Sequence, residues 1–354
     1  MLTDEGYLNN TDITEFLKSY NGPDVRLMEI CGSHTAAIAS SGIRTLLSDK
    51  IRMISGPGCP VCVTVTDYID RLLDLSEIDG NVICTFGDLM RVPGSNGTLS
   101  DARARGADIR MFYSPFDMLE PASEEKGRRF IFAAVGFETT APVYASLLWK
   151  VIESGLDNVM LLTSLKTMPE VVKKIGSKMD GFLLPGHVCT VTGYGLYEPI
   201  ASEINTPMVA AGFEPENIIQ AVYALAKLRG RGIVKNFYPA VVTREGNKKA
   251  MDTIDTFFEA GDAAWRGMGV IKGSGLYLRE EYSRFDAGST GLTGDRENTG
   301  CRCAYVITGE EKSSDCPLFN KTCTPNTPKG ACMVSREGAC FNEFIHPVKD
   351  RGER

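Results

Sequence analysis

Short apolar runs recur along this chain, and most of them end at glycine, proline or a polar residue. The runs are four to seven residues long, and amphipathic stretches such as 67–76, 143–153 and 169–177 lie between them. Buried runs of this length that alternate with helices are typical of βαβ units, whose strands form parallel sheets. We therefore predict an α/β fold, with strands at residues 26–30, 51–54, 81–85, 109–113, 129–135, 158–162, 181–184 and 207–210.

The chain length and a polar segment at 121–127 indicate how the chain divides into domains. Its 354 residues exceed what one hydrophobic core usually serves. We predict two Rossmann-like α/β domains with parallel sheets, at residues 24–122 and 128–240. The sequence Gly-Phe-Glu follows an apolar run twice, which fits two similar halves. Residues 241–354 are rich in glycine and cysteine, and we predict a smaller third domain there, packed with residues 1–23.

The charge and the apolar runs exclude some classes of function. The formal net charge is -7, which disfavours a nucleic-acid partner because phosphate binding needs a basic surface. Residues 1–10 include two acidic residues and lack the apolar core of a secretory signal. No apolar run is long enough to cross a bilayer. We therefore expect a cytoplasmic protein without a membrane partner.

Chemically distinctive side chains follow many of the predicted strands. In open α/β sheets, ligands bind beyond the carboxyl ends of the strands. Because so many such residues fall at these ends, we expect them to share one cleft. They are Cys31, Cys59, Cys62, Asp88, Glu138, His187 and Glu214.

Cysteine is the prominent soft ligand of this chain. There are 11 cysteines and only three histidines, and in a reducing compartment that balance favours metal binding or redox chemistry over structural disulfides. Six of the cysteines fall within forty residues near the C-terminus, without the paired knuckles of most structural zinc sites. We favour an iron–sulfur cluster there, and zinc is the alternative. The six are Cys301, Cys303, Cys316, Cys323, Cys332 and Cys340.

Two further cysteine motifs follow predicted strands. Cys59 and Cys62 form a C-x2-C pair in a turn rich in glycine and proline, which favours a redox pair, with a zinc knuckle or chance as alternatives. Cys31 precedes His34 by one helical turn, and a neutral imidazole there could accept the thiol proton. The simpler interpretation of this second motif is a buried cysteine beside a structural histidine.

Several polar residues allow both a functional and a structural interpretation. Glu138 and Glu214 follow apolar runs, where a carboxylate is costly unless it is paired or functional, although either could lie at the start of a helix. Asp88 and Arg91 could form a structural ion pair. His187 is a third candidate for the site. The remaining cysteines, Cys84 and Cys189, are predicted to lie in the core.

Taken together and in this order, the motifs resemble the hydrogenase maturation protein HypD family, from about residue 27 to residue 340. The segments that carry the resemblance are MEICGSHTAAI, SGPGCPVCVT, TFGDLMRVPGS, GADIRMFYSPFDML, VGFETTAP, LLPGHV, AAGFEP, DAAWRGMGVIKGSGL and CPLFNKTCTPNTPKGACMVSREGAC. The family often has a second histidine two residues after the first, and this chain has Ala36 there.

The resemblance implies a third domain that holds a [4Fe–4S] cluster, and a role as the scaffold on which the Fe(CN)2CO group of [NiFe]-hydrogenases is assembled. It implies HypC as the partner that shares the iron, HypE as the source of cyanide, and the hydrogenase large-subunit precursor as an indirect partner. The chain would then be a redox-active assembly scaffold rather than a conventional turnover enzyme. The alternatives are an iron–sulfur-dependent thiol–disulfide oxidoreductase and a zinc-stabilised docking protein.

The resemblance also assigns roles to individual residues. Cys31 would bind the iron that carries cyanide and CO, and Cys59 and Cys62 would be a redox-active pair that supplies electrons from the cluster. His34, Glu138, His187 and Glu214 are the other candidates for catalytic roles. Our expected cluster ligands are Cys303, Cys316, Cys323 and Cys340, with Cys301 and Cys332 as extras.

Overall fold

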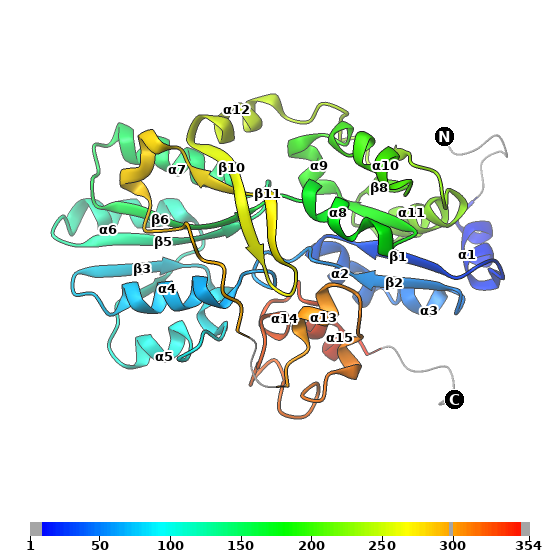
Figure 1. Cartoon of the computed structure of the whole chain (residues 1–354), viewed down its shortest axis with the longest axis horizontal. Coiled ribbons are helices and arrows are strands. Elements are labelled where there is room, and N and C mark those ends of the chain that lie inside the picture. The colour runs from blue at the N-terminus through cyan, green and yellow to red at the C-terminus, as the bar shows by residue number, and fades with distance from the viewer. Residues whose placement is uncertain (1–8, 297–299, 348–354) are drawn as a thin grey trace.

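The computed structural model describes residues 9–296 and 300–347, which form two sheets and a small C-terminal unit (Figure 1). Sheet A has five parallel strands in the order β2-β1-β7-β8-β9. Its strands are β1 (Val25–Glu29), β2 (Ile51–Ser55), β7 (Gly181–Pro185), β8 (Met208–Ala211) and β9 (Val234–Asn236).

Sheet B has six strands in the order β10-β11-β6-β5-β3-β4, of which β3 to β6 are parallel and β10 and β11 are antiparallel. Its strands are β3 (Asn81–Thr85), β4 (Ile109–Met111), β5 (Arg129–Gly136), β6 (Val159–Lys166), β10 (Phe258–Trp265) and β11 (Gly269–Leu278). The prediction of an α/β fold with parallel sheets is confirmed, and all eight predicted strands are present.

Helices cover both faces of the sheets. The α-helices are α1 (Asn10–Ser19), α2 (Gly32–Ser40), α3 (Ile43–Leu46), α4 (Thr66–Ser76), α5 (Leu99–Ala104), α6 (Leu119–Glu124), α7 (Ala141–Glu153), α8 (Pro169–Ile175), α9 (Gly186–Thr192), α10 (Glu198–Ile204), α11 (Pro215–Lys227), α12 (Lys248–Phe257), α13 (Cys303–Ile307), α14 (Ala331–Val334) and α15 (Ala339–Ile345). The 3-10 helices are η1 (Gly87–Arg91), η2 (Pro115–Met118), η3 (Gly176–Lys178), η4 (Gly195–Tyr197), η5 (Glu280–Phe285) and η6 (Ser313–Asp315).

Sheet A is buried on both faces, which explains why its strands read as continuous apolar runs. Leu27 and Met28 are consecutive residues of β1 and are both fully buried, yet their side chains belong to different hydrophobic clusters. Successive side chains of a strand point to opposite faces. The two clusters therefore lie on opposite sides of the sheet.

The chain does not divide between the sheets at the expected boundary, so the predicted domains 24–122 and 128–240 are wrong as structural units. It builds β1 and β2 in sheet A, crosses to sheet B for β3 to β6, and returns to sheet A for β7 to β9. The polar segment 121–127 lies between β4 and β5 of one sheet. Its polarity reflects a position at the surface rather than a domain boundary.

The predicted third domain is also too long. Residues 258–278 form the β10–β11 hairpin, which adds to sheet B through pairing of β11 with β6. Only residues 300–347 make up the cysteine unit, a compact set of short helices below and between the two sheets in Figure 1. The expected packing of residues 1–23 on this unit is wrong for α1, which packs on α11 and α3 at the far end of sheet A. Residues 1–8 lie outside the described part.

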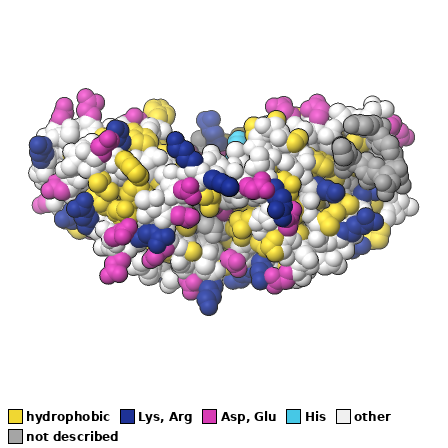
Figure 2. Space-filling model, turned by 90° about the horizontal axis from the view of Figure 1, so that it is seen from above, with side chains coloured by type: hydrophobic (Ala, Val, Ile, Leu, Met, Phe, Trp, Pro, Cys, Tyr) yellow, Lys and Arg dark blue, Asp and Glu magenta, His cyan; other side chains and the backbone are white. Residues whose placement is uncertain are grey.

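The surface carries both signs of charge. Figure 2 shows acidic and basic side chains interspersed over the face seen from above, without a broad basic area. Within the described residues, no helix is long and apolar enough to cross a membrane.

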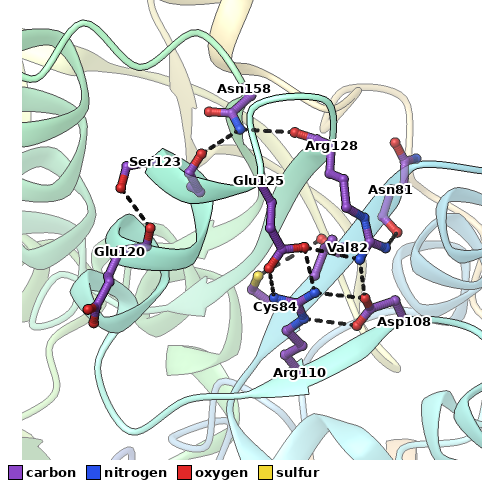
Figure 3. Close-up of polar contacts among 11 residues, drawn as sticks. Asn81, Val82, Cys84, Asp108, Arg110, Glu120, Ser123, Glu125, Arg128 and Asn158 are labelled. Atoms are coloured by element: carbon purple, nitrogen blue, oxygen red, sulfur yellow. Dashed lines mark hydrogen bonds and ion pairs between the residues drawn. The ribbon is translucent and has the colours of Figure 1, made fainter.

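A network of ion pairs fastens the edge strand β4 to the rest of sheet B (Figure 3). The Arg110 guanidinium donates to Asp108 at 2.9 Å and to Glu125 at 2.6 Å, and Arg128 donates to Asp108 at 2.6 Å. These hydrogen bonds, Arg110 first, hold the pKa of Asp108 below its ordinary value, and Arg110 does the same for Glu125. The network ties β4 to the segment after α6 and to the start of β5.

Replacing Arg110 tests how much this network stabilises the edge strand. We expect Arg110→Met to lower the free energy of unfolding by about 1–2 kcal/mol, because charge-assisted bidentate pairs are stronger than single exposed pairs. Lys150→Met, which removes an exposed pair with Glu153, is the control and should cost less than about 0.5 kcal/mol. Urea unfolding at pH 7 measures both. The loss of unfolding free energy in Arg110→Met should shrink toward pH 3. The folded-state pKa values of Asp108 and Glu125 are lowered, so the stabilisation that these carboxylates contribute is lost as pH falls and they become protonated. Equal losses of unfolding free energy in the two variants would show that the network stabilises the fold no more than one exposed ion pair does.

Candidate functional site

The parallel strands of both sheets point their carboxyl ends toward the middle of the molecule (Figure 1). In sheet A, β1 and β7 are neighbours, while the chain leaves them in opposite directions toward β2 and β8. In sheet B, β3 and β5 have the same relationship, with crossovers toward β4 and β6. Such switch points are where α/β sheets bind ligands. The residues that follow these four strands include Cys31, His187, Asp88 and Glu138.

The turns after β1 and β2 are held together through their backbones. The Gly32 amide donates to the Gly58 carbonyl at 3.0 Å, and the Gly56 amide donates to the Glu29 carbonyl at 2.8 Å. A side chain at Gly58 would collide with the backbone of Ile30 and Cys31. Only glycine allows this approach, and it places Cys31 beside the C-x2-C loop.

Cys59 and Cys62 form a disulfide, with their Cα atoms 5.2 Å apart. Both are buried, at 3% and 1% exposed. The Cys62 sulfur lies 4.0 Å from the Ala331 carbonyl oxygen of α14. The pair therefore lies between the Cys31 turn and the cysteine unit, and solvent reaches neither sulfur freely.

Cys31 is the residue that precedes α2, and its thiol is buried. Burial raises the pKa of this thiol to about 12, hydrogen bonds from the backbone amides of His34 and Ser33 oppose the rise, and the charges of Glu29 and Glu337 add to it. The thiol is therefore protonated at neutral pH. A bound cation would reverse this balance, because metal ligation requires the thiolate.

His34 and His187 both contact the ring of Phe213, with ring centroids 4.7 and 4.3 Å from it. His34 is completely buried, and its Nε2 lies 2.9 Å from the Gly212 carbonyl oxygen. Burial lowers the pKa of His34 to about 4, so the ring is neutral and Nε2 is the donor. Its Nδ1 is buried without a hydrogen-bond partner among the described residues. His187 is exposed.

The two Gly-Phe-Glu sequences end in different environments. Glu138 is buried, and its Oε1 accepts a hydrogen bond from the Met168 amide at 2.8 Å, while its Oε2 has no partner among the described residues. Burial raises the pKa of Glu138 to about 7. Glu214 is exposed and simply precedes α11. The position of Glu214 at the start of α11 fits its structural interpretation, and the site roles of Glu138 and Glu214 stay predictions.

Asp88 and Arg91 do not pair with each other. Asp88 accepts a hydrogen bond from the Ser335 hydroxyl at 3.2 Å, and Arg91 donates to the Pro325 carbonyl at 2.7 Å. Both partners belong to the cysteine unit. These two residues of η1, which follows β3 of sheet B, therefore anchor that unit, and the ion pair offered as their structural interpretation is not formed.

The six cysteines of the C-terminal unit lie together, and all but the half-buried Cys301 are buried. The Cys303 and Cys332 sulfurs are 2.6 Å apart, and Cys332 is also hydrogen-bonded to Cys340. A side chain at Gly330 would meet the Cys301 sulfur at 2.7 Å. Within residues 9–296 and 300–347, no three Cys, His, Asp or Glu side chains are spaced as ligands of one metal ion. The donor chemistry, buried thiols without an imidazole, fits an iron–sulfur cluster.

The comparisons with known proteins bear on these motifs. A family model described as "HypD: Hydrogenase formation hypA family" matches residues 10–346. The chain belongs to the HypD family. Similar proteins include the hydrogenase maturation factor HypD of Rhizobium leguminosarum bv. viciae, which is 44% identical over 336 residues, covering 90% of this chain and 87% of that one.

The other relatives show the same extent of similarity. HypD of Escherichia coli K12 is 42% identical over 326 residues, covering 89% of this chain and 87% of its own. HypD of Rhodobacter capsulatus is 41% identical over 330 residues, with 89% and 88% covered. The resemblance predicted from the motifs is confirmed, and hydrogenase maturation is the process to which this HypD-family chain belongs.

Two carboxylates beside Cys31, those of Glu29 and Glu337, were not identified as candidates from the sequence of this HypD-family chain. Glu29 is fully buried in β1 and accepts hydrogen bonds from the Thr35 hydroxyl at 2.5 Å and from the Cys31 amide at 3.1 Å. Because a carboxylate is costly inside an apolar run, this position could have identified Glu29 as a candidate from the sequence. Glu337 accepts a hydrogen bond from Ser33 at 3.3 Å and fills the space over Gly32. Glu337 lies in a polar stretch of the sequence, where no pattern distinguishes one carboxylate as a candidate.

Removing the Glu337 side chain should uncover Cys31. We expect Glu337→Ala to raise the rate at which iodoacetamide alkylates Cys31 at pH 8, since the variant opens the space over Gly32 and removes a charge that raises the thiol pKa. Mass spectrometry of the Cys31 peptide measures the rate. Glu216→Ala, at an exposed position of α11, is the control and should alkylate as the wild type does. Unchanged alkylation in Glu337→Ala would mean that this side chain does not shield the thiol.

The buried carboxyl of Glu29 should make folding stability depend on pH. Burial raises its pKa from 4.5 to about 7, so the stability it contributes is present below pH 4.5 and is lost as pH rises through 7. Between pH 5 and 8 we expect the wild type to lose roughly 2–3 kcal/mol of unfolding free energy relative to Glu29→Gln. Urea unfolding at both pH values measures this difference. Glu214→Gln, at an exposed carboxyl, should follow the wild type, and a Glu29→Gln curve parallel to both would contradict the prediction.

Proposed function

We propose that this HypD-family chain is a scaffold for assembling the Fe(CN)2CO group of [NiFe]-hydrogenases, with iron as its substrate and Cys31 as the iron-binding residue. HypC would share the iron, and HypE would supply cyanide. The observation that carries the proposal is the contact between the Gly32 and Gly58 turns, which puts a buried thiol beside a buried redox pair.

The surroundings of Cys31 suit a thiol that becomes a ligand only when metal arrives. Its proton is retained at neutral pH because burial and two nearby carboxylates disfavour the thiolate. Ferrous iron would displace that proton, and the amides of Ser33 and His34 would then stabilise the negative sulfur. A thiolate is a strong electron donor, which suits iron that carries cyanide and CO.

The nearby carboxylates give this thiol a local destination for its proton. Glu29 bonds the Cys31 amide through one oxygen and the Thr35 hydroxyl through the other, and its pKa of about 7 allows both charge states near neutral pH. Glu337 lies against Gly32 from the cysteine unit. We assign Glu29 to proton balance and Glu337 to shielding of the thiol.

Cys59 and Cys62 would be the redox-active pair. Cleavage of their disulfide to two thiols consumes two electrons and two protons. The pair lies between the Cys31 turn and α14 of the cysteine unit, which is the position that an intermediary in electron supply requires. Burial of both sulfurs also protects the reduced pair from solution oxidants.

We propose Cys303, Cys316, Cys323 and Cys340 as the ligands of a [4Fe–4S] cluster, with Cys301 and Cys332 as extras. When bound, such a cluster supplies electrons one at a time. The chain contributes a buried, imidazole-free set of thiols and fastens it to sheet B through Asp88 and Arg91. Cys332 contacts Cys303 and Cys340, which makes it the first candidate to replace either one.

The alternative function, a thiol–disulfide oxidoreductase, is disfavoured by burial. A protein disulfide must reach an attacking thiolate, and access limits the rate of that exchange. Cys59 and Cys62 are only 3% and 1% exposed, beneath the cysteine unit. A pair in this position suits an internal electron route better than a protein substrate.

Metal analysis of protein purified without oxygen tests the proposal. We expect about four iron and four sulfide per chain with broad visible absorption, lost in Cys316→Ala. Cys84→Ala is the matched control, because Cys84 is also a buried cysteine but lies in the core of sheet B. Any iron beyond four should disappear in Cys31→Ala while the cluster stays. A colourless protein with one zinc would contradict the redox role, and loss of cluster absorption in Cys84→Ala would show that the mutants merely unfold.

A further inference from the structure

The turn of the β10–β11 hairpin lies where the C-x2-C loop meets the cysteine unit. β11 joins β6 through Gly275 and Leu276, and the preceding residues of the hairpin extend past Lys166, the last residue of β6. Figure 1 shows the turn in the middle of the molecule, just above the cysteine unit. The turn contains Arg266 and Gly267, which the proposed function does not use.

Arg266 is a buried cation that holds the end of the C-x2-C loop. It is 5% exposed, and its guanidinium donates to the Thr64 carbonyl through Nε at 3.1 Å and through a terminal nitrogen at 2.6 Å. Its backbone amide donates to the Val63 carbonyl at 2.9 Å. Val63 and Thr64 directly follow Cys62. Three hydrogen bonds from one residue therefore fix the chain at the point where it leaves the redox pair.

A carboxylate compensates this buried charge and holds the guanidinium in place. The other terminal nitrogen of Arg266 lies 3.1 Å from a carboxylate oxygen of Asp295. Asp295 also accepts hydrogen bonds from the Gly267 amide at 3.1 Å and from the hydroxyl of Thr66, the first residue of α4, at 3.3 Å. A buried charge needs a partner and further hydrogen bonds of this kind. The pair therefore ties the hairpin turn to the connection between Cys62 and α4.

The hairpin that carries Arg266 is itself fixed on two sides. The buried amine of Lys166 in β6 donates to the Ala264 carbonyl of β10 at 2.8 Å, which fastens the hairpin to sheet B. The turn also touches the cysteine unit, because a side chain at Gly267 would come within 2.7 Å of the Cα atom of Ala304 in α13. Arg266 therefore extends from a turn that contacts both sheet B and the cysteine unit.

We propose that Arg266 is a positioning residue for the redox pair, which holds the segment after Cys62 in the conformation that brings the two sulfurs to bonding distance. This inference rests on the proposed function for the redox role of Cys59 and Cys62. Two thiols in a fixed loop meet at a higher effective concentration than two thiols in a loose loop, so they form the disulfide more readily. Arg266 therefore favours the oxidised pair and makes its reduction potential more negative.

The test measures the equilibrium between this pair and dithiothreitol in full-length protein purified without oxygen. Dithiothreitol gives two electrons and two protons to the disulfide and closes to its own cyclic disulfide. Mass spectrometry after thiol trapping reports how much of the Cys59–Cys62 peptide is reduced. We expect Arg266→Met to lower the equilibrium constant for disulfide formation about tenfold or more, which makes the potential about 30 mV less negative. Arg266→Lys keeps the charge without the planar fork, and its constant should lie between those of Arg266→Met and the wild type.

Arg71→Met is the matched control for a lost arginine. Arg71 is a half-buried residue of α4 that donates to the Ala287 carbonyl at 3.0 Å, and its replacement should leave the constant within about twofold of wild type. Equal shifts in Arg71→Met and Arg266→Met, or wild-type constants in both Arg266 variants, would overturn the positioning role and leave the redox pair in place. A wild-type disulfide that dithiothreitol cannot reduce in the folded chain would overturn the redox role itself and this inference with it.

Discussion

The backbone contact between the Gly32 and Gly58 turns is the constraint on which the rest of the site depends. It joins two strand ends so closely that no side chain fits at Gly58. As a result Cys31, Cys59 and Cys62 are neighbours although they come from different βα connections. The glycine and proline residues of the second turn therefore serve an interaction between segments, not only the local shape of a loop.

Burial then sets the charge state of the groups gathered there. The pKa of the Cys31 thiol and those of the Glu29 and Glu138 carboxyls are raised, while that of His34 is lowered, and in each case burial is the largest cause. All four groups are thus biased toward their neutral forms, which is the inexpensive state in a desolvated interior. A cation that enters such a site gains ligands by displacing protons, so metal binding and proton release are coupled.

The way in which the chain crosses between the sheets explains why the small cysteine unit contacts residues of both sheets. Two crossings are made between β2 and β7, so both sheets present their strand ends to the same central region. The cysteine unit spans that region: η1 of sheet B holds it through Asp88 and Arg91, and Glu337 reaches the α2 end of sheet A. Of the seven residues expected to share one cleft, Cys31, Cys59, Cys62 and Glu138 are buried, whereas Asp88, His187 and Glu214 are exposed.

The sequence by itself determined the strands and the residues at their ends. All eight predicted strands are present, because apolar runs, glycine punctuation and amphipathic spacing are local signals that each element carries within itself. The same signals put Cys31, Cys59, Cys62 and Glu138 at strand ends. The β10–β11 hairpin was missed since its many glycines weaken the strand pattern.

Only the tertiary structure decided which strands share a sheet and which candidates face the interior. Pairing of β1 with β7 joins residues about 150 positions apart, and no local pattern encodes that choice. Glu138 and Glu214 follow the same Gly-Phe sequence, yet one is buried and the other is exposed, because different elements pack over them. Glu337 became part of the site only through the docking of the cysteine unit on Gly32. Burial and contact depend on how the segments pack in the assembled fold, whereas strand formation follows from the apolar pattern within each segment.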